Sequence, residues 1–147
     1  MTNKLRFVLL LLFGVILAGA AAVPALAHHS FSAEFNQDLP ATFTGTLTGI
    51  DWINPHVQLY LDEKNADGTV THWKIESGPT AHFRACHLKR EMFQTGQVLT
   101  MRVYMAKDRT KNFAWMRNAT FVGGPYDGQS YEFGAGGLDE HGNPIQE

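Results

Sequence analysis

Two adjacent histidines, His28 and His29, carry the strongest chemical signal in this 147-residue chain. They directly follow Ala27, and cleavage after that residue would make His28 the new N-terminus. The freed α-amino group, with a reference pKa of about 7.7–8.0, could bind a metal ion together with the His28 imidazole. Amine and imidazole nitrogens suit Cu(II). His56 is the candidate third donor, because it begins a strand after a turn at Pro55.

These donors are compatible with three functions. The favoured one is a non-catalytic binding module that holds a metal ion, copper foremost, or a small ligand. The second is a copper-dependent oxidase that uses the same residues as a histidine brace with an open coordination position. The third is a structural or accessory subunit of an envelope complex. In that case the terminal histidines are a solvated segment and His56 hydrogen-bonds the turn backbone. The sequence contains no Gly-rich phosphate loop, nucleophile elbow or HExxH motif.

A second set of chemically capable side chains lies in a predicted helix. His82 and Cys86 are four residues apart, so they share one helix face and could form a soft-metal or nucleophile–base pair. We favour the alternative that Cys86 packs under the helix as a small apolar residue.

The aromatic residues offer candidates for a ligand-binding surface. Tyr60 and Tyr104 lie on the opposite faces of their predicted strands from the main apolar sets. They are predicted, with Trp52, to contact a small ligand. Trp73 and Trp115 are predicted to belong to the core.

The composition excludes several classes of protein. A formal net charge of -2 gives no general electrostatic footprint for nucleic acid, so no nucleic-acid partner is expected. A single cysteine excludes an intramolecular disulfide framework and a four-cysteine zinc site. The sequence identifies no protein partner.

The N-terminal segment predicts export. Lys4 and Arg6 precede a nearly continuous apolar run over 7–23, and Ala25 and Ala27 form an Ala-x-Ala cleavage site. This pattern is typical of a secretory signal peptide over 1–27. We therefore expect a periplasmic or secreted protein with no stable membrane anchor after cleavage. The alternative is an uncleaved anchor, since the apolar run is near the lower length limit for a membrane span.

The rest of the chain predicts a mainly β fold. An N-terminal arm over 28–40 precedes a domain over 41–124, and a Gly-rich tail covers 125–147. Alternating residues predict strands, and Gly49 predicts a bulge, because Ile50 and Trp52 continue the apolar set one step out of phase until Asn54-Pro55 breaks the run. Pro79 stops the third predicted strand, and Thr80 is predicted to cap the first turn of a helix. Three strands, a helix and two strands favour a small five-stranded OB-like antiparallel barrel over an open β-sandwich. The predicted strands are 42–48, 56–62, 70–76, 98–105 and 113–122, with a helix at 81–92 and an additional short strand at 131–133.

Several short motifs carry a family resemblance. His28-His29-Ser30-Phe31, the segment Trp52-Ile53-Asn54-Pro55-His56 and the later Asp67-Gly68 turn occur in this order. Together they resemble the bacterial secreted family known as domain of unknown function (DUF) 6152 over roughly 28–122. The resemblance implies a small exported β-barrel domain and no particular activity. The chain also looks distantly similar to bacterial periplasmic OB-fold proteins thought to bind small ligands or cations.

Overall fold

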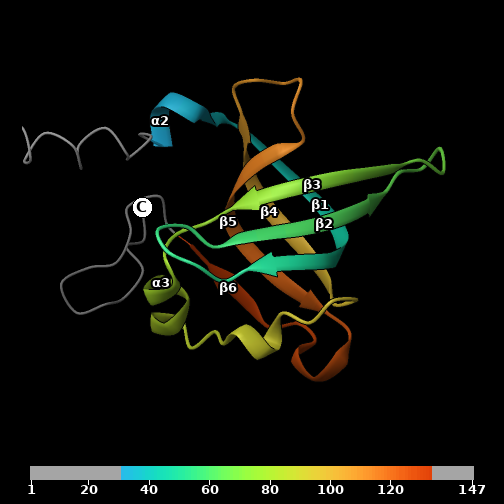
Figure 1. Cartoon of the computed structure of the whole chain (residues 1–147). Helices are drawn as coiled ribbons and strands as arrows, with labels where there is room; N and C mark the ends of the chain where they lie inside the picture. Colours follow the sequence, from blue (N-terminus) through green and yellow to red (C-terminus); the bar gives the residue numbers. More distant parts are fainter. Residues whose placement is uncertain (1–30, 134–147) are drawn as a thin grey trace, which may run out of the picture. The chain divides into compact units, whose positions relative to one another are not determined.

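The computed structural model describes residues 31–133 (Figure 1). The predicted signal peptide, His28, His29 and the tail from residue 134 lie outside the described residues. The chain divides into two units, Met1–Ala33 and Glu34–Glu147, and the barrel belongs to the second. The elements in chain order are α2 Phe31–Glu34, β1 Phe35–Asp51, β2 Gln58–Lys64, β3 Val70–Glu76, α3 Thr80–Ala85, η2 Arg90–Met92, β4 Val98–Ala106, β5 Phe113–Val122, η3 Gly124–Tyr126 and β6 Ser130–Glu132.

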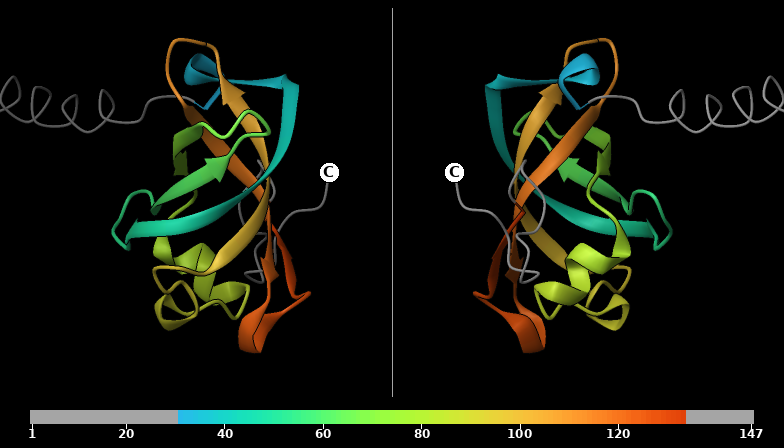
Figure 2. Two further views of the ribbon diagram at one scale, coloured as in Figure 1. Left: turned by 90° about the vertical axis from the view of Figure 1, so that its right-hand side faces the viewer. Right: turned by 90° about the vertical axis from the view of Figure 1, so that its left-hand side faces the viewer.

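The strands form a closed barrel. Their order is β3-β2-β1-β4-β5-β6, and a further pairing between β3 and β5 closes the first five into a ring (Figure 2). The predicted small OB-like barrel with a helix between its third and fourth strands is confirmed. The prediction that it is purely antiparallel is wrong, because β3 and β5 run parallel, with Lys74 opposite Phe113 and Glu76 opposite Trp115. An odd number of strands cannot close with every neighbouring pair antiparallel, so one seam must be parallel.

The first strand is long enough to pair with two neighbouring strands. β1 pairs with β4 from Phe35 to Thr46 and with β2 from Thr46 to Asp51. Its register shifts between Leu47 and Gly49, which confirms the predicted bulge. The strand starts at Phe35, within the range assigned to the N-terminal arm, because Phe35 and then Pro40 onward pair with β4.

Alternating residues fill the interior of the barrel. Leu59 and Leu61 on β2, Ile75 on β3, and Leu99 and Met101 on β4 are almost completely buried. This burial of every second side chain is the period that the strand predictions used. The residues that close one end come from the segment between β3 and β4: Phe83, Leu88, Met92 and Phe93.

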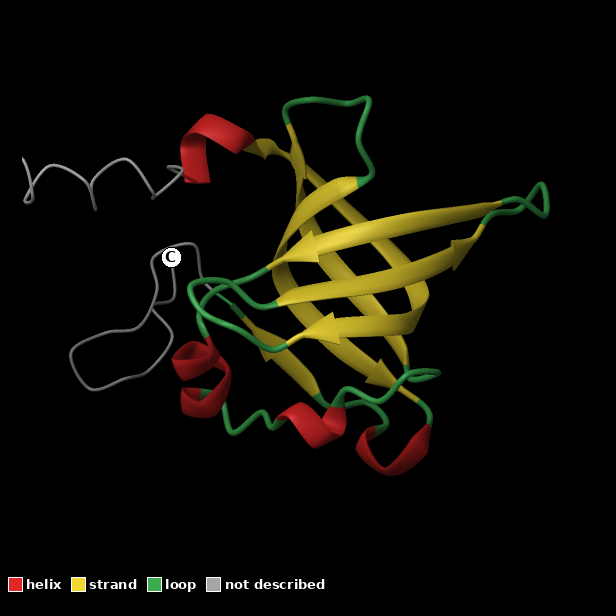
Figure 3. Cartoon of the chain, in the orientation of Figure 1, coloured by secondary structure: helices red, strands yellow, loops and turns green. Residues whose placement is uncertain are grey.

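That segment is not one continuous helix over 81–92. α3 ends after Ala85, and His87 has a left-handed backbone (φ 60°) that stops the helix. Thr80 does not cap α3. Its backbone N–H and its hydroxyl both donate to Asn54 Oδ1 at 3.1 Å, which ties the helix to the loop between β1 and β2. Figure 3 shows α3 and the two 3-10 helices at one end of the barrel, which we call the base.

β6 lies outside the closed ring. Its three residues pair only with β5, with Ala119 opposite Tyr131. The short strand predicted at 131–133 is thus present, one residue earlier. Among the described residues, no helix has the length and apolar character needed to cross a membrane.

Candidate functional site

His56 and Glu76 form a histidine–carboxylate pair beside the parallel seam between β3 and β5. His56 Nδ1 contacts Glu76 Oε1, and the two side chains are 30% and 12% exposed. Backbone hydrogen bonds between the adjacent residues fix the pair. Ser77 N donates to Val57 O at 2.9 Å, and Val57 N donates to Gly78 O at 3.1 Å. The loop before β2 and the end of β3 therefore hold the two side chains together.

An indole ring lies against this pair. The Trp115 ring is perpendicular to the His56 ring, with centroids 5.4 Å apart. Phe35, at the start of β1, packs against the same indole at 5.5 Å. Trp115 is half-buried on the outer side of the barrel and does not contribute to the core, so its prediction as a core residue is wrong. Trp73 does pack on the core, stacked on Phe43 at 4.8 Å. We call His56, Glu76 and Trp115 the seam site.

The geometry of the seam site defines what its histidine can do. An ionised Glu76 accepts a hydrogen bond from His56 Nδ1–H, which fixes the ring orientation and leaves the Nε2 lone pair for another partner. A carboxylate on the far ring nitrogen is the usual outer-shell partner of a metal-binding histidine. Within residues 31–133, no three side chains of His, Cys, Asp or Glu lie together as a metal-binding group. The seam site thus offers one oriented nitrogen donor.

A second histidine–carboxylate pair lies on the hairpin formed by β2 and β3. His72 Nδ1 and Asp62 Oδ1 are 2.6 Å apart, and the side chains are 78% and 35% exposed. Water therefore screens this pair much more than it screens the pair at the seam. The two pairs make a matched comparison, since they have the same chemistry at different depths.

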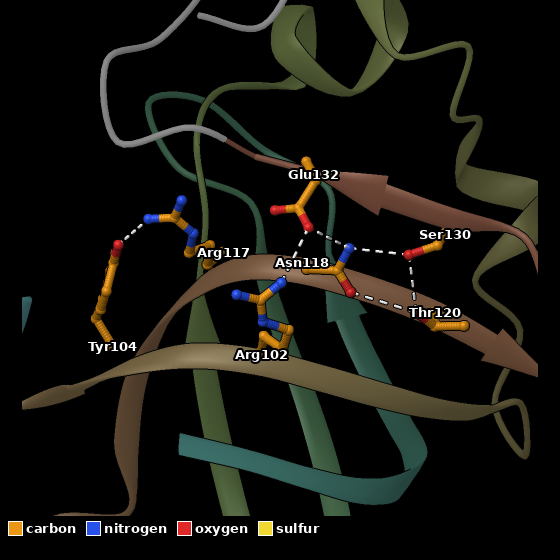
Figure 4. Close-up of polar contacts among 7 residues, drawn as sticks. All are labelled: Arg102, Tyr104, Arg117, Asn118, Thr120, Ser130 and Glu132. Carbon is orange, nitrogen blue, oxygen red and sulfur yellow. Dashed lines mark hydrogen bonds and ion pairs between the residues drawn. The ribbon is translucent and has the colours of Figure 1, made fainter. Parts of the chain in front are cut away.

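The three predicted ligand-surface residues come from the loop after β1, from β2 and from β4. Tyr60 is half-buried on the outer face of β2, and its hydroxyl donates to Asp51 Oδ2 at 2.8 Å. That hydrogen bond, then burial, then the Asp51 charge raise the pKa of Tyr60. Tyr104 is buried, and its hydroxyl accepts a hydrogen bond from Arg117 (Figure 4). Trp52 packs edge-on against Phe83 at 4.9 Å.

His82 and Cys86 are positioned by packing. His82 is 4% exposed, and burial lowers its pKa below the usual 6.5. Burial also raises the pKa of the Cys86 thiol, which disfavours the reactive thiolate. Cys86 is partly buried and packs against the core, as the favoured interpretation predicts.

Glu76 is the site residue that sequence reasoning missed. It ends a predicted strand, and nothing in its sequence neighbourhood distinguishes it from an ordinary solvated carboxylate. The hairpin register carries a usable signal, because Glu76 lies opposite Gln58, two residues from His56.

The fold and the seam site define a small mixed β-barrel protein with OB-like topology and one oriented surface imidazole. Residues 16–114 match the family described as "Family of unknown function (DUF6152)", and the chain belongs to this family. The family resemblance predicted from the motifs is thereby confirmed. No curated protein and no solved structure matches the chain.

Proposed function

We propose that this protein is an exported, non-catalytic binding module for a metal ion, copper foremost. His56 supplies one nitrogen ligand through Nε2, and His28 and His29 supply the others. The observation that carries this proposal is the contact between His56 Nδ1 and Glu76 Oε1. A carboxylate on Nδ1 sets the tautomer and increases the basicity of the opposite ring nitrogen, which favours a bound cation.

The length of the chain before β1 is compatible with this set of ligands. His29 is six residues before Phe35, and an extended chain covers about 3.3–3.6 Å per residue. The segment can therefore span about 20 Å from Phe35. Phe35 and His56 pack against the same Trp115 indole, so β1 begins close to the seam site.

The donor types favour copper over other divalent ions. Imidazole and amine nitrogens without thiolates fit Cu(II), which also binds most tightly in the Irving–Williams order. The His28 amine becomes a donor only after cleavage following Ala27, so metal binding depends on export and processing.

Titration of the processed protein with Cu(II), followed by electron paramagnetic resonance, tests the proposal. Mass spectrometry first establishes that the chain begins at His28. We expect His28→Ala and His56→Ala each to weaken copper binding by at least about tenfold, because each removes a nitrogen ligand. His72→Ala is the matched control. It removes a histidine from the other histidine–carboxylate pair and leaves the affinity unchanged.

Each alternative function predicts a different result. A mature chain that begins elsewhere, or unchanged binding in His56→Ala, contradicts the proposal. Tight binding together with reductant-driven peroxide production favours the copper-dependent oxidase. Failure of the processed protein to bind copper leaves the role of an accessory subunit.

A further inference from the structure

Two buried polar side chains, Ser77 and His82, do not belong to the seam site. Ser77 is 0% exposed and His82 is 4% exposed. Neither Ser77 Oγ nor His82 Nε2 has a hydrogen-bond partner within residues 31–133. Buried polar atoms are almost always paired, so such an arrangement calls for an explanation.

An aromatic anchor next to β6 covers His82. Phe133 directly follows β6, is 2% exposed, and its ring centroid lies 5.3 Å from that of His82 and 4.9 Å from that of Phe83. Its backbone N–H donates to Arg117 O at 2.5 Å. The His82 imidazole is therefore enclosed between α3 and the end of β6.

Besides Phe133, β6 is held by its pairing with β5, by Tyr131, which packs against the core with its ring 6.1 Å from that of Phe121, and by side-chain hydrogen bonds. Asn118 Nδ2 donates to Ser130 Oγ at 2.9 Å and to Glu132 Oε1 at 3.1 Å, and Arg102 Nη1 lies 3.3 Å from the same carboxylate oxygen (Figure 4). Because β3 pairs with β5, the barrel stays closed without β6. Gly123 and Gly124, both at positive φ, lead into the loop before it. Detachment of β6 thus requires no opening of the five-stranded ring.

We propose that β6 and Phe133 form an acid-opened latch, in which protonation of the buried His82 imidazole releases both from the base while the barrel stays closed. A cation in this enclosure costs free energy unless a carboxylate compensates it. The released state returns the imidazolium to water.

Within residues 31–133, the carboxylates next in sequence to Ser77 and to Phe133 are bonded to other groups. Glu76 is next to Ser77, and its carboxylate contacts His56. Glu132 is next to Phe133, and its carboxylate contacts Arg102 and Asn118. No hydrogen bond or ion pair joins either carboxylate to His82 in the described part of the chain.

The remaining charged and titratable groups around His82 do not stabilise its cation. On its own helix, Arg84 is positively charged and donates to Thr80 Oγ1 at 3.2 Å, and Cys86 is a thiol whose pKa burial raises. On β5, the carbonyl of Arg117 accepts the hydrogen bond from the Phe133 N–H, and its guanidinium donates to the Tyr104 hydroxyl.

The direction of the pH effect follows from linkage. Burial lowers the pKa of His82 in the closed state, so the open state binds a proton more readily. The closed state has its full stability above pH 6.5, where both states are neutral, and loses stability as the pH falls below 6.5. The opening equilibrium rises by up to about tenfold per pH unit until the pKa of the closed state is reached.

Amide hydrogen exchange on the purified full chain, at pH 7.5 and 5.0 and corrected for intrinsic exchange chemistry, tests the latch. We expect the amides of Tyr131 and Phe133 to exchange at least about tenfold faster at pH 5.0, while the β2–β3 hairpin keeps its protection. His82→Leu should abolish the change. The matched control is His87→Asn, which removes an exposed histidine at a position whose positive φ asparagine tolerates.

Three results would overturn the latch: no pH dependence of β6 exchange in the wild-type protein, equal loss of protection in the hairpin, or a pH dependence that persists in His82→Leu. If His82→Leu does not fold, the nuclear magnetic resonance titration of the His82 ring in the wild-type protein decides. The midpoint of opening must then coincide with the ionisation of His82.

Discussion

The seam and the base of the barrel each contain a histidine, and the two sites differ in the groups that contact the imidazole ring. At the seam, His56 is partly exposed and has Glu76 on one nitrogen. At the base, His82 is buried against Phe133 and has no bonded carboxylate among the described residues. The first arrangement orients the ring and leaves its second nitrogen available to a cation. The second arrangement disfavours a charge on the imidazole, so His82 contributes to the fold by packing.

Removal of the aromatic anchor at the base should have the largest effect. We expect Phe133→Ala to reduce the free energy of unfolding by about 3 kcal/mol, because it leaves a cavity against Phe83 and His82. Urea denaturation at pH 7.5 measures this change. A loss below about 1 kcal/mol would mean that Phe133 does not anchor β6 and that the base does not depend on packing.

Disruption of the seam pair should have an intermediate effect. We expect Glu76→Gln to reduce the free energy of unfolding by about 1 kcal/mol, because the amide can accept the His56 hydrogen bond but lacks the charge. The same denaturation experiment on Asp62→Asn provides the control. That pair is exposed, so its loss should cost less than about 0.5 kcal/mol. Equal losses of stability in Glu76→Gln and Asp62→Asn would contradict the expectation that the less exposed pair contributes more.

The exposed polar contacts of β6 should contribute least. Arg102 and Glu132 are 56% and 52% exposed at the side chain, so we expect Arg102→Ala to change the free energy of unfolding by less than about 0.5 kcal/mol. A double-mutant cycle with Phe133→Ala measures whether the polar contacts and the aromatic anchor act together. A larger effect for Arg102→Ala than for Phe133→Ala would reverse the proposed roles at the base.

Much of the fold was predictable because strands leave a local signal. The alternation that buries Leu59, Leu61 and Ile75 is visible in the sequence, and so is the bulge before Gly49. The helix prediction failed at His87, because apolar composition does not reveal a single residue in the left-handed region. The parallel pairing of β3 with β5 depends on closure of the ring, which no local pattern encodes.

The candidate site was only partly predictable for the same reason. The sequence selected His56 by its residue type and its place after Pro55, but Glu76 and Trp115 come from β3 and β5. Strict alternation along β5 would place Trp115 on the same face as the buried Ala119 and Phe121, which is why the sequence predicts it in the core. A bulge at Arg117, between the residues opposite Arg102 and Val103, separates Trp115 from the core face that follows.

The sequence by itself determined the β-rich composition of the domain, the places of most strands and the family, since these depend on local periodicity and short motifs. Only the tertiary structure decided which histidine has a carboxylate partner and which is enclosed by aromatic rings. Pairing and burial depend on contacts between residues far apart in the chain. His56 and Glu76 meet because β3 returns beside β2, and His82 is covered because the chain returns with Phe133 after β5.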